Sequence, residues 1–325
     1  MLLRRLFYVL AALGLVGSGC GMRGSAGQHR TIPFADGRAT TRPGDPRGSN
    51  LSAVTVNDAG TGDKIKLRLK LHKGARSNYA VKVTTSIIQD LGSQTNTIKI
   101  PPIIEDLQLR IMDVRDGIAS FHYEVTGARL DNEGLLSSSQ VETLRSYLRR
   151  LVGLGRDGKI DDRGAVLSAK VHIPASVPAE ARLTLQQFSD QLRTVSVPLP
   201  EEAFGQDASW TSKTKLKLSG ATVEVSNEYQ LARIDGSRFT IDVKQHQSAE
   251  PQPIKLPSLP AGSTARVVDW NVEASGEMTL KLANIFPDAK LHASGRQAFT
   301  VTVDNDDQSV KQDLSVDTEL TDLGN

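Results

Sequence analysis

Residues 221–247 read ATVEVSNEYQLARIDGSRFTIDVKQHQ. Apolar and polar residues alternate on both sides of the pair Asp235-Gly236, and such a pair between two alternating runs is typical of a β-hairpin turn. Alternation continues nearly to the C-terminus, through runs such as EMTLKL (residues 277–282) and VKQDLSVDTELT (residues 310–321). Because a period of two gives a strand one apolar and one polar face, the sequence predicts a mainly antiparallel β structure.

The same period begins near residue 63. In KIKLRLKLHKG, residues 64–74, four aliphatic residues alternate with basic ones, which predicts a strand with one apolar and one cationic face. YAVKVTTSII, residues 79–88, is the predicted hairpin partner of this strand. LQLRIMDV and ASFHYEVTGARL predict a second hairpin, with its turn at Arg115-Asp116-Gly117.

The two β segments resemble each other. RLKLHKGARSNYAVKV in the first is matched loosely by KLKLSGATVEVSNEYQL in the second. We therefore interpret residues 63–325 as a single β-rich domain with an internal duplication, residues 63–130 and 205–325, around a helical insert at residues 137–195.

Two helices are predicted in that insert. The first opens with the capping-box pattern Ser139-x-x-Glu142, ends at Gly153 and spans residues 138–153. The second begins near Pro178 and spans residues 178–194. Each helix presents one apolar stripe at a period of 3.6 residues. The stripes comprise Val141, Leu144, Leu148, Leu151 and Val152 in the first helix, and Ala181, Leu185, Phe188 and Leu192 in the second. Between the helices, LGRDGKI and AVLSAKVHI predict a hairpin around Asp157-Gly158.

The N-terminus predicts export. Arg4 and Arg5 precede an apolar run at residues 6–16, and small residues follow it, which is the order of a secretory signal spanning residues 1–19. The sequence Gly-Ser-Gly-Cys, ending at Cys20, resembles the lipobox of bacterial lipoproteins, although Gly17 stands where that motif usually has Leu. The resemblance implies lipidation of Cys20 by a fatty acyl group such as palmitate. The protein would then be anchored to the bacterial cell membrane and face the extracytoplasmic side.

Residues 20–62 are predicted to form the lipidated cysteine and a disordered tether. GMRGSAGQHR and TRPGDPRGSN are rich in Gly, Pro, Ser and charged residues and show no apolar period. Such a segment cannot bury enough apolar surface to offset its chain entropy.

The overall order is similar to a family of uncharacterised exported bacterial lipoproteins, and VPLPEEAFGQDASWTSKTKL, residues 197–216, is the stretch most like that family. The family supplies no activity and no catalytic residue. Its architecture is similar to the lipoprotein-carrier superfamily, in which a curved sheet wraps helices around an apolar cavity. The resemblance implies an α+β fold that is mainly β: a strongly curved antiparallel sheet or half-barrel with two amphipathic helices inserted mid-chain.

The residues predict no enzyme, metal or cofactor. The six histidines are never three or four residues apart, Cys20 is the single cysteine, and no Gly-x-Ser-x-Gly or phosphate-loop motif is present. The acidic residues Asp304, Asp306 and Asp307 are interpreted as a hairpin turn. Loss of Arg4 and Arg5 with the signal leaves 37 basic and 37 acidic residues, so a nucleic-acid partner is not expected.

Two functions remain open. In the first, the helices close over a curved sheet and leave a cavity for a lipid or other hydrophobic ligand, walled by the helix residues Leu144, Leu148, Leu151, Leu185, Phe188 and Leu192. In the second, the core is filled and the protein is a structural or protein-interaction module of the cell envelope. The sequence leaves the ligand and the oligomeric state open.

Overall fold

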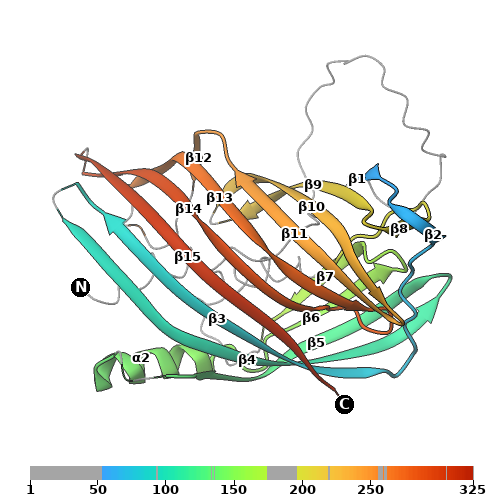
Figure 1. Ribbon diagram of the computed structural model, residues 1–325. Coiled ribbons are helices and arrows are strands. Elements are labelled where there is room, and N and C mark those ends of the chain that lie inside the picture. Colours follow the sequence, from blue (N-terminus) through green and yellow to red (C-terminus); the bar gives the residue numbers. More distant parts are fainter. Residues whose placement is uncertain are drawn as a thin grey trace, which may run out of the picture.

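The structure, a computed structural model, describes residues 53–325 apart from 93, 133, 135, 174–195, 219, 255–258, 260–261, 305 and 325. A thirteen-stranded antiparallel sheet dominates these residues (Figure 1). Its strand order is β1-β9-β10-β11-β13-β14-β15-β3-β4-β5-β6-β7, with β12 paired to β13. The order has two free ends, β1 and β7, so the sheet does not close into a barrel.

The sheet consists of two meanders joined by the pairing of β15 with β3, and β1 is added at one edge by pairing with β9. The first meander comprises β3 (Arg76–Asp90), β4 (Thr95–Arg115), β5 (Ile118–Leu130), β6 (Gly155–Asp161) and β7 (Val166–His172). The second comprises β9 (Ser209–Leu218), β10 (Ala221–Asp235), β11 (Arg238–Ser248), β12 (Gln252–Ile254), β13 (Thr264–Lys281), β14 (Asp288–Val303) and β15 (Asp306–Gly324). Pairing of β15 with β3 places the two β segments in one continuous sheet.

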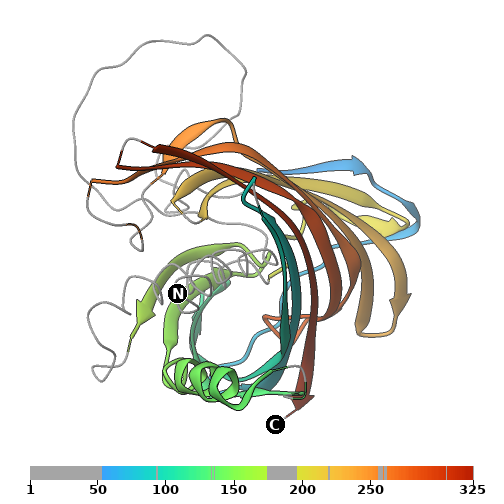
Figure 2. The ribbon, with the colours of Figure 1, turned by 90° about the vertical axis from the view of Figure 1, so that its left-hand side faces the viewer.

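Strong curvature gives this sheet a concave and a convex face (Figure 2). Bulges interrupt the register in several strands, for example between Val83 and Thr85 in β3 and between Val267 and Asp269 in β13, and bulges bend a strand. Gly295 also permits the bend, because a Cβ at this position would lie 2.6 Å from the Cα of Val272 on the neighbouring strand. Gly276 on β13 is crowded in the same way by the backbone of β14.

The two faces differ in chemistry. Alternate residues of each long strand are buried on the concave face, while the convex face is exposed and carries ion pairs between neighbouring strands. These pairs are His246–Glu273, His292–Asp317, Arg296–Asp313 and Lys290–Glu319, at 2.6, 2.7, 3.0 and 3.2 Å respectively. The predicted alternation of apolar and polar faces is thus confirmed.

Helix α2 (Ser138–Arg149) is the only α-helix among the described residues. It confirms the first predicted helix, with a different cap: the capping box is formed by Ser137 and Gln140 rather than by Ser139 and Glu142. The helix ends at Arg149, four residues before Gly153. The second predicted helix, residues 178–194, lies outside the described residues.

Four other predictions need correction. First, β1 (Ala53–Asp58) pairs with β9, and β2 (Thr61–Ile65) pairs with β8 (Phe204–Gln206), so residues 53–62 are not a disordered tether. Second, only the first two residues of the strand predicted at 64–74 belong to a strand. Third, its predicted partner β3 pairs with β4 and β15 instead. Fourth, Asp157-Gly158 lies inside β6, and the β6–β7 turn follows Asp161.

The hairpin predictions at the other turns are confirmed. Asp116 and Gly117 both have positive φ, 51° and 74°, as a two-residue turn between β4 and β5 requires. Gly236 lies in the connection between β10, which ends at Asp235, and β11. Asp304, with a φ of 53°, lies in the β14–β15 turn, whereas Asp306 and Asp307 belong to β15.

The close strand approach at Gly295 provides a test of the curvature. We expect Gly295→Val to lower the free energy of unfolding by about 2–3 kcal/mol, because the added side chain must displace the backbone of β13. Ser294→Val, one residue away on the exposed face, should change it by no more than about 0.5 kcal/mol. Urea unfolding of both variants measures the difference, and equal effects would show that the bend does not depend on the glycine.

Candidate ligand-binding face

The concave face carries two groups of buried side chains, which we call the aromatic cluster and the aliphatic cluster. The aromatic cluster contains most of the buried rings of the described chain, and contacts such as Trp210–Tyr229 (5.4 Å between ring centres) and Tyr79–Phe286 (5.4 Å) bind them together. The aliphatic cluster has small, mostly branched side chains and two rings, Trp270 and Phe299. The two halves of the face therefore offer different surfaces.

Segments outside the large sheet cover the aromatic cluster. Leu67 and Leu69 come from the extended segment 66–72, which crosses the end of the sheet, where the backbone N–H of Leu69 donates to Asp162 and that of Lys70 to Leu282. Val197 and Leu199 belong to the segment before β8, and α2 and the turn after it add further aliphatic residues. This half is a closed, two-layered core.

The aliphatic cluster is built differently. All of its fully buried members lie on strands of the large sheet: Ile87, Leu216, Leu218, Ala221, Val223, Val225, Ile254, Ala265, Val267, Trp270, Val272, Ala274, Ala293, Val301, Val310, Leu314 and Val316. Among the described residues, only Ala249 and Leu259, in connections between strands, join it from outside a strand. Among the described residues, this half of the face therefore has no second layer comparable with the one that covers the aromatic cluster.

The centre of the concave face carries very small side chains. Ala274 pairs with Ala293 across β13 and β14, and both are buried. The next inward positions on these strands are Gly276 and Gly295. Four neighbouring inward positions at the boundary between the two clusters therefore have no side chain larger than a methyl group.

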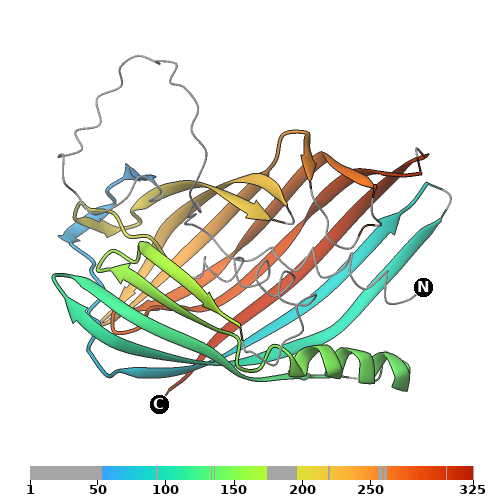
Figure 3. The ribbon, with the colours of Figure 1, turned by 180° about the vertical axis from the view of Figure 1, so that it is seen from behind.

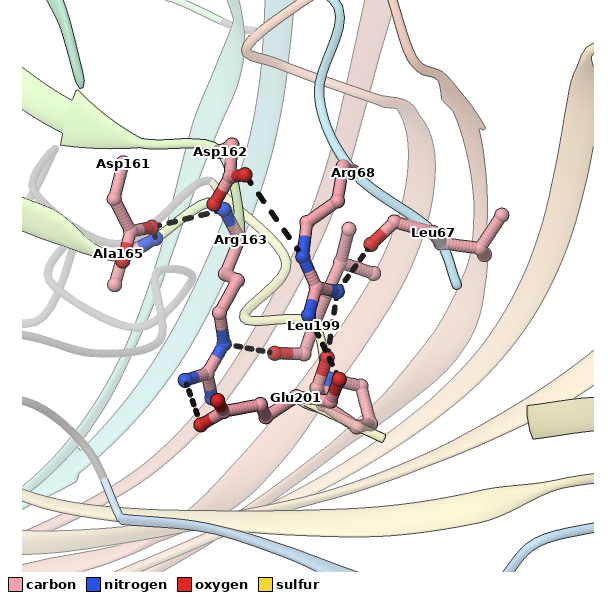
Figure 4. Close-up of polar contacts among 9 residues, drawn as sticks. Leu67, Arg68, Asp161, Asp162, Arg163, Ala165, Leu199 and Glu201 are labelled. Carbon is pink, nitrogen blue, oxygen red and sulfur yellow. Dashed lines mark hydrogen bonds and ion pairs between the residues drawn. The ribbon is translucent and has the colours of Figure 1, made fainter. Parts of the chain in front are cut away.

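A polar network around Arg68 and Arg163 holds together the segments that cover the aromatic cluster, and we call it the Arg68 clamp (Figure 4). The Arg68 guanidinium donates to the carbonyl oxygens of Leu67, Pro200 and Glu201 at 2.6–2.8 Å, and its Nε lies 3.9 Å from the Asp162 carboxylate. Arg163 donates to the Leu199 carbonyl, which ties the β6–β7 turn to the same segment. Since backbone oxygens occupy these guanidinium groups, the network is a structural clamp rather than an anion site.

Asp161 completes this clamp from the buried side. Its Oδ1 accepts hydrogen bonds from the backbone N–H groups of Arg163 and Ala165 at 3.0 and 2.8 Å, which hold the β6–β7 turn. Burial raises the pKa of the Asp161 carboxyl, and the two backbone hydrogen bonds oppose that change.

Glu105 is an ionisable group on the concave face that sequence reasoning missed. It lies on β4 between the inward residues Ile103 and Leu107, and its side chain is 6% exposed. Burial raises the pKa of the Glu105 carboxyl to about 7. Tyr147 of α2 lies near enough that the charge of Glu105, after burial, contributes to raising the tyrosine pKa to about 12. The signal in the sequence was a glutamate at a position of β4 where alternation predicts an inward, apolar residue.

Glu105 should make stability depend on pH. Since the carboxyl has a higher pKa in the folded protein, its favourable contribution is complete below about pH 4.5 and is lost as the pH rises through about 7. We expect Glu105→Gln to remove this loss and to raise the free energy of unfolding at pH 8 by up to about 3 kcal/mol. Denaturant titrations from pH 4 to pH 8 measure it. The exposed Glu228→Gln is the control, and identical pH profiles for the two variants would contradict the assignment.

The structure brings together three of the predicted site residues. Leu144, Leu148 and Leu151 are 8%, 1% and 2% exposed, and the last two belong to the aromatic cluster, so this helix face is buried as predicted. Leu185, Phe188, Leu192 and Cys20 lie outside the described residues. No group of three metal-binding side chains occurs in the described part of the chain. No helix of the described residues is long and apolar enough to cross a membrane.

Comparison with known proteins adds little. No family model matches the chain, and no curated protein matches it. Among solved structures, the chain matches the crystal structure of Ail, the attachment invasion locus protein of Yersinia pestis, with 8% identity. The match covers 77% of this chain and 100% of Ail, with a TM-score of 0.14. A score this low supports no argument about fold or function.

Proposed function

We propose that the protein is an extracytoplasmic lipoprotein, anchored through lipid on Cys20, whose concave face binds a hydrophobic ligand of the acyl-lipid class. One observation carries the ligand proposal: the aliphatic cluster is buried, yet its fully buried members all lie on a single-layered sheet. Burying such a face contributes roughly 25 cal/mol per Å², whether its partner is protein or lipid. A lining of Ala, Val, Leu and Ile suits acyl chains.

The ligand would lie beside the covered half of the face. Leu148 of α2 and Leu151 of the following turn belong to the aromatic cluster, and Leu144 is buried on the same helix face. These three residues would form the wall of the binding site at its covered half. Figure 3 shows α2 at one end of the curved sheet, beside β4 and β5. Leu185, Phe188 and Leu192 keep the wall-forming role that their helical spacing predicts. The acyl chains would lie over the small side chains of Ala274 and Ala293.

A larger side chain at one of these small positions tests the proposal. We expect Ala293→Phe to reduce binding of a C16–C18 acyl lipid by at least tenfold while the lipid-free protein still unfolds cooperatively, because the ring occupies the space of the chain. Ser294→Phe, on the exposed face of the same strand, should bind like the unmodified protein. Mass spectrometry of organic extracts from natively purified protein, followed by reloading of delipidated protein, measures binding. Absence of lipid from every preparation would favour a structural or interaction module.

Lipidation has its own test. We expect Cys20→Ser to remove the acyl group, so that the protein leaves the membrane fraction or keeps its signal, whereas Ser25→Ala should fractionate normally. Membrane fractionation and the mass of the N-terminal peptide measure the outcome. Membrane attachment of Cys20→Ser at the normal level would show that another feature anchors the chain.

A further inference from the structure

A row of polar side chains crosses the aliphatic cluster. Register pairs Trp270 of β13 with Gln297 of β14, Gln297 with Gln312 of β15, Gln312 with Gln89 of β3, and Gln89 with Asn96 of β4. Directly paired residues share one face of a sheet, so these five side chains form one line on the concave face. Trp270, Gln297, Gln312 and Gln89 are only 2–5% exposed.

Three N–H donors of this row have no partner. The indole Nε1 of Trp270, the amide Nε2 of Gln297 and the amide Nδ2 of Asn96 are buried atoms that make no hydrogen bond in the described structure. The oxygen of Asn96, in contrast, accepts a hydrogen bond from Gln94 at 2.8 Å. Burying an unsatisfied donor is costly, so three in one row require an explanation.

In a second polar row on the same face, the amide N–H donors do have hydrogen-bond acceptors. On β9, β10 and β11, Asn227 donates to Ser212 at 3.2 Å, Gln245 donates to Asn227 at 2.8 Å, and Gln247 donates to Gln245 at 2.6 Å. Buried amide side chains on this sheet can therefore form hydrogen bonds with one another along a row. The unpaired donors at Trp270, Gln297 and Asn96 contrast with the paired amide donors of this second row.

We propose that the ester carbonyl oxygens of an acyl lipid accept hydrogen bonds from this row, with the acyl chains lying over the adjacent aliphatic residues. This inference rests on the proposed lipid binding. The donors are amide and indole groups, and the row contains no charged side chain, so it suits a neutral carbonyl better than a phosphate. Next to the row lie Val272, Leu314 and Ile87, which offer the chains an apolar surface.

The length of the row fits more than one ester group. Neighbouring strands lie about 4.8 Å apart, so the four steps from Trp270 to Asn96 span roughly 19 Å. The donors at the first two positions are adjacent, and that at Asn96 is three strands further. A diacyl lipid carries its two ester carbonyls on adjacent carbons, so it can reach the neighbouring donors of Trp270 and Gln297 together, which a free fatty acid cannot. Asn96, three strands further, would require a second lipid molecule.

A comparison of ester with ether lipids tests this inference separately from the lipid-binding proposal. Diacylglycerophosphocholine and its dialkyl ether analogue have chains of equal length, but only the first has carbonyl oxygens. We expect the unmodified protein to prefer the diacyl lipid by roughly tenfold in a competition read by mass spectrometry. In Trp270→Phe/Gln297→Met the preference should disappear, ether-lipid binding should persist, and the lipid-free protein should melt at a higher temperature.

Gln245→Met provides the matched control, since it removes an amide whose N–H donor is paired, in the second row on the same face. It should lower the melting temperature and leave the ester preference intact. Equal binding of both lipids by the unmodified protein would overturn the inference while leaving lipid binding in place. Binding of neither lipid would overturn the proposed function and the inference together.

Discussion

The structure depends on one constraint: a single-layered sheet with one apolar face must have that face covered. The long strands of this protein bury alternate residues on the concave side and expose ion-paired residues on the convex side. Curvature brings the two meanders around a common interior but leaves the sheet open, with free ends at β1 and β7. The apolar surface of so long a sheet therefore exceeds what the described helix and crossing segments can cover.

The chain meets this constraint differently at its two ends. At the aromatic end, segment 66–72, the residues before β8 and α2 form a second layer, and the Arg68 clamp ties two of these segments together through backbone oxygens. At the aliphatic end the fully buried residues come from strands alone, the side chains at Ala274 and Ala293 are small, and three donors of one polar row lack acceptors. One end is a filled core, and the other is the half at which we propose that lipid binds.

Sequence reasoning predicted what depends on local pattern. Alternation identified the strands of the second meander, Asp116-Gly117 identified a hairpin turn, and the apolar stripe identified α2. It failed at residues 66–72, where Leu67 and Leu69 are buried as alternation requires but the backbone bonds to distant loops, because alternation reports burial and not pairing. The β3–β15 pairing, which joins residues more than 200 positions apart, has no local signal. The inward polar positions at Glu105 and Gln297 did have one, since each interrupts the apolar side of an alternating strand.

The two tryptophans allow the central claim to be measured directly. Trp270 lies in the aliphatic cluster and Trp210 in the aromatic cluster, and they are the only tryptophans in the chain. A diacyl lipid brominated along its chains quenches tryptophan emission at short range. If lipid covers the aliphatic half, it should quench part of the emission of the unmodified protein and leave the emission of Trp270→Phe, which retains Trp210, unchanged. Equal quenching in both proteins, or none in either while lipid is bound, would contradict binding at the aliphatic half of the concave face.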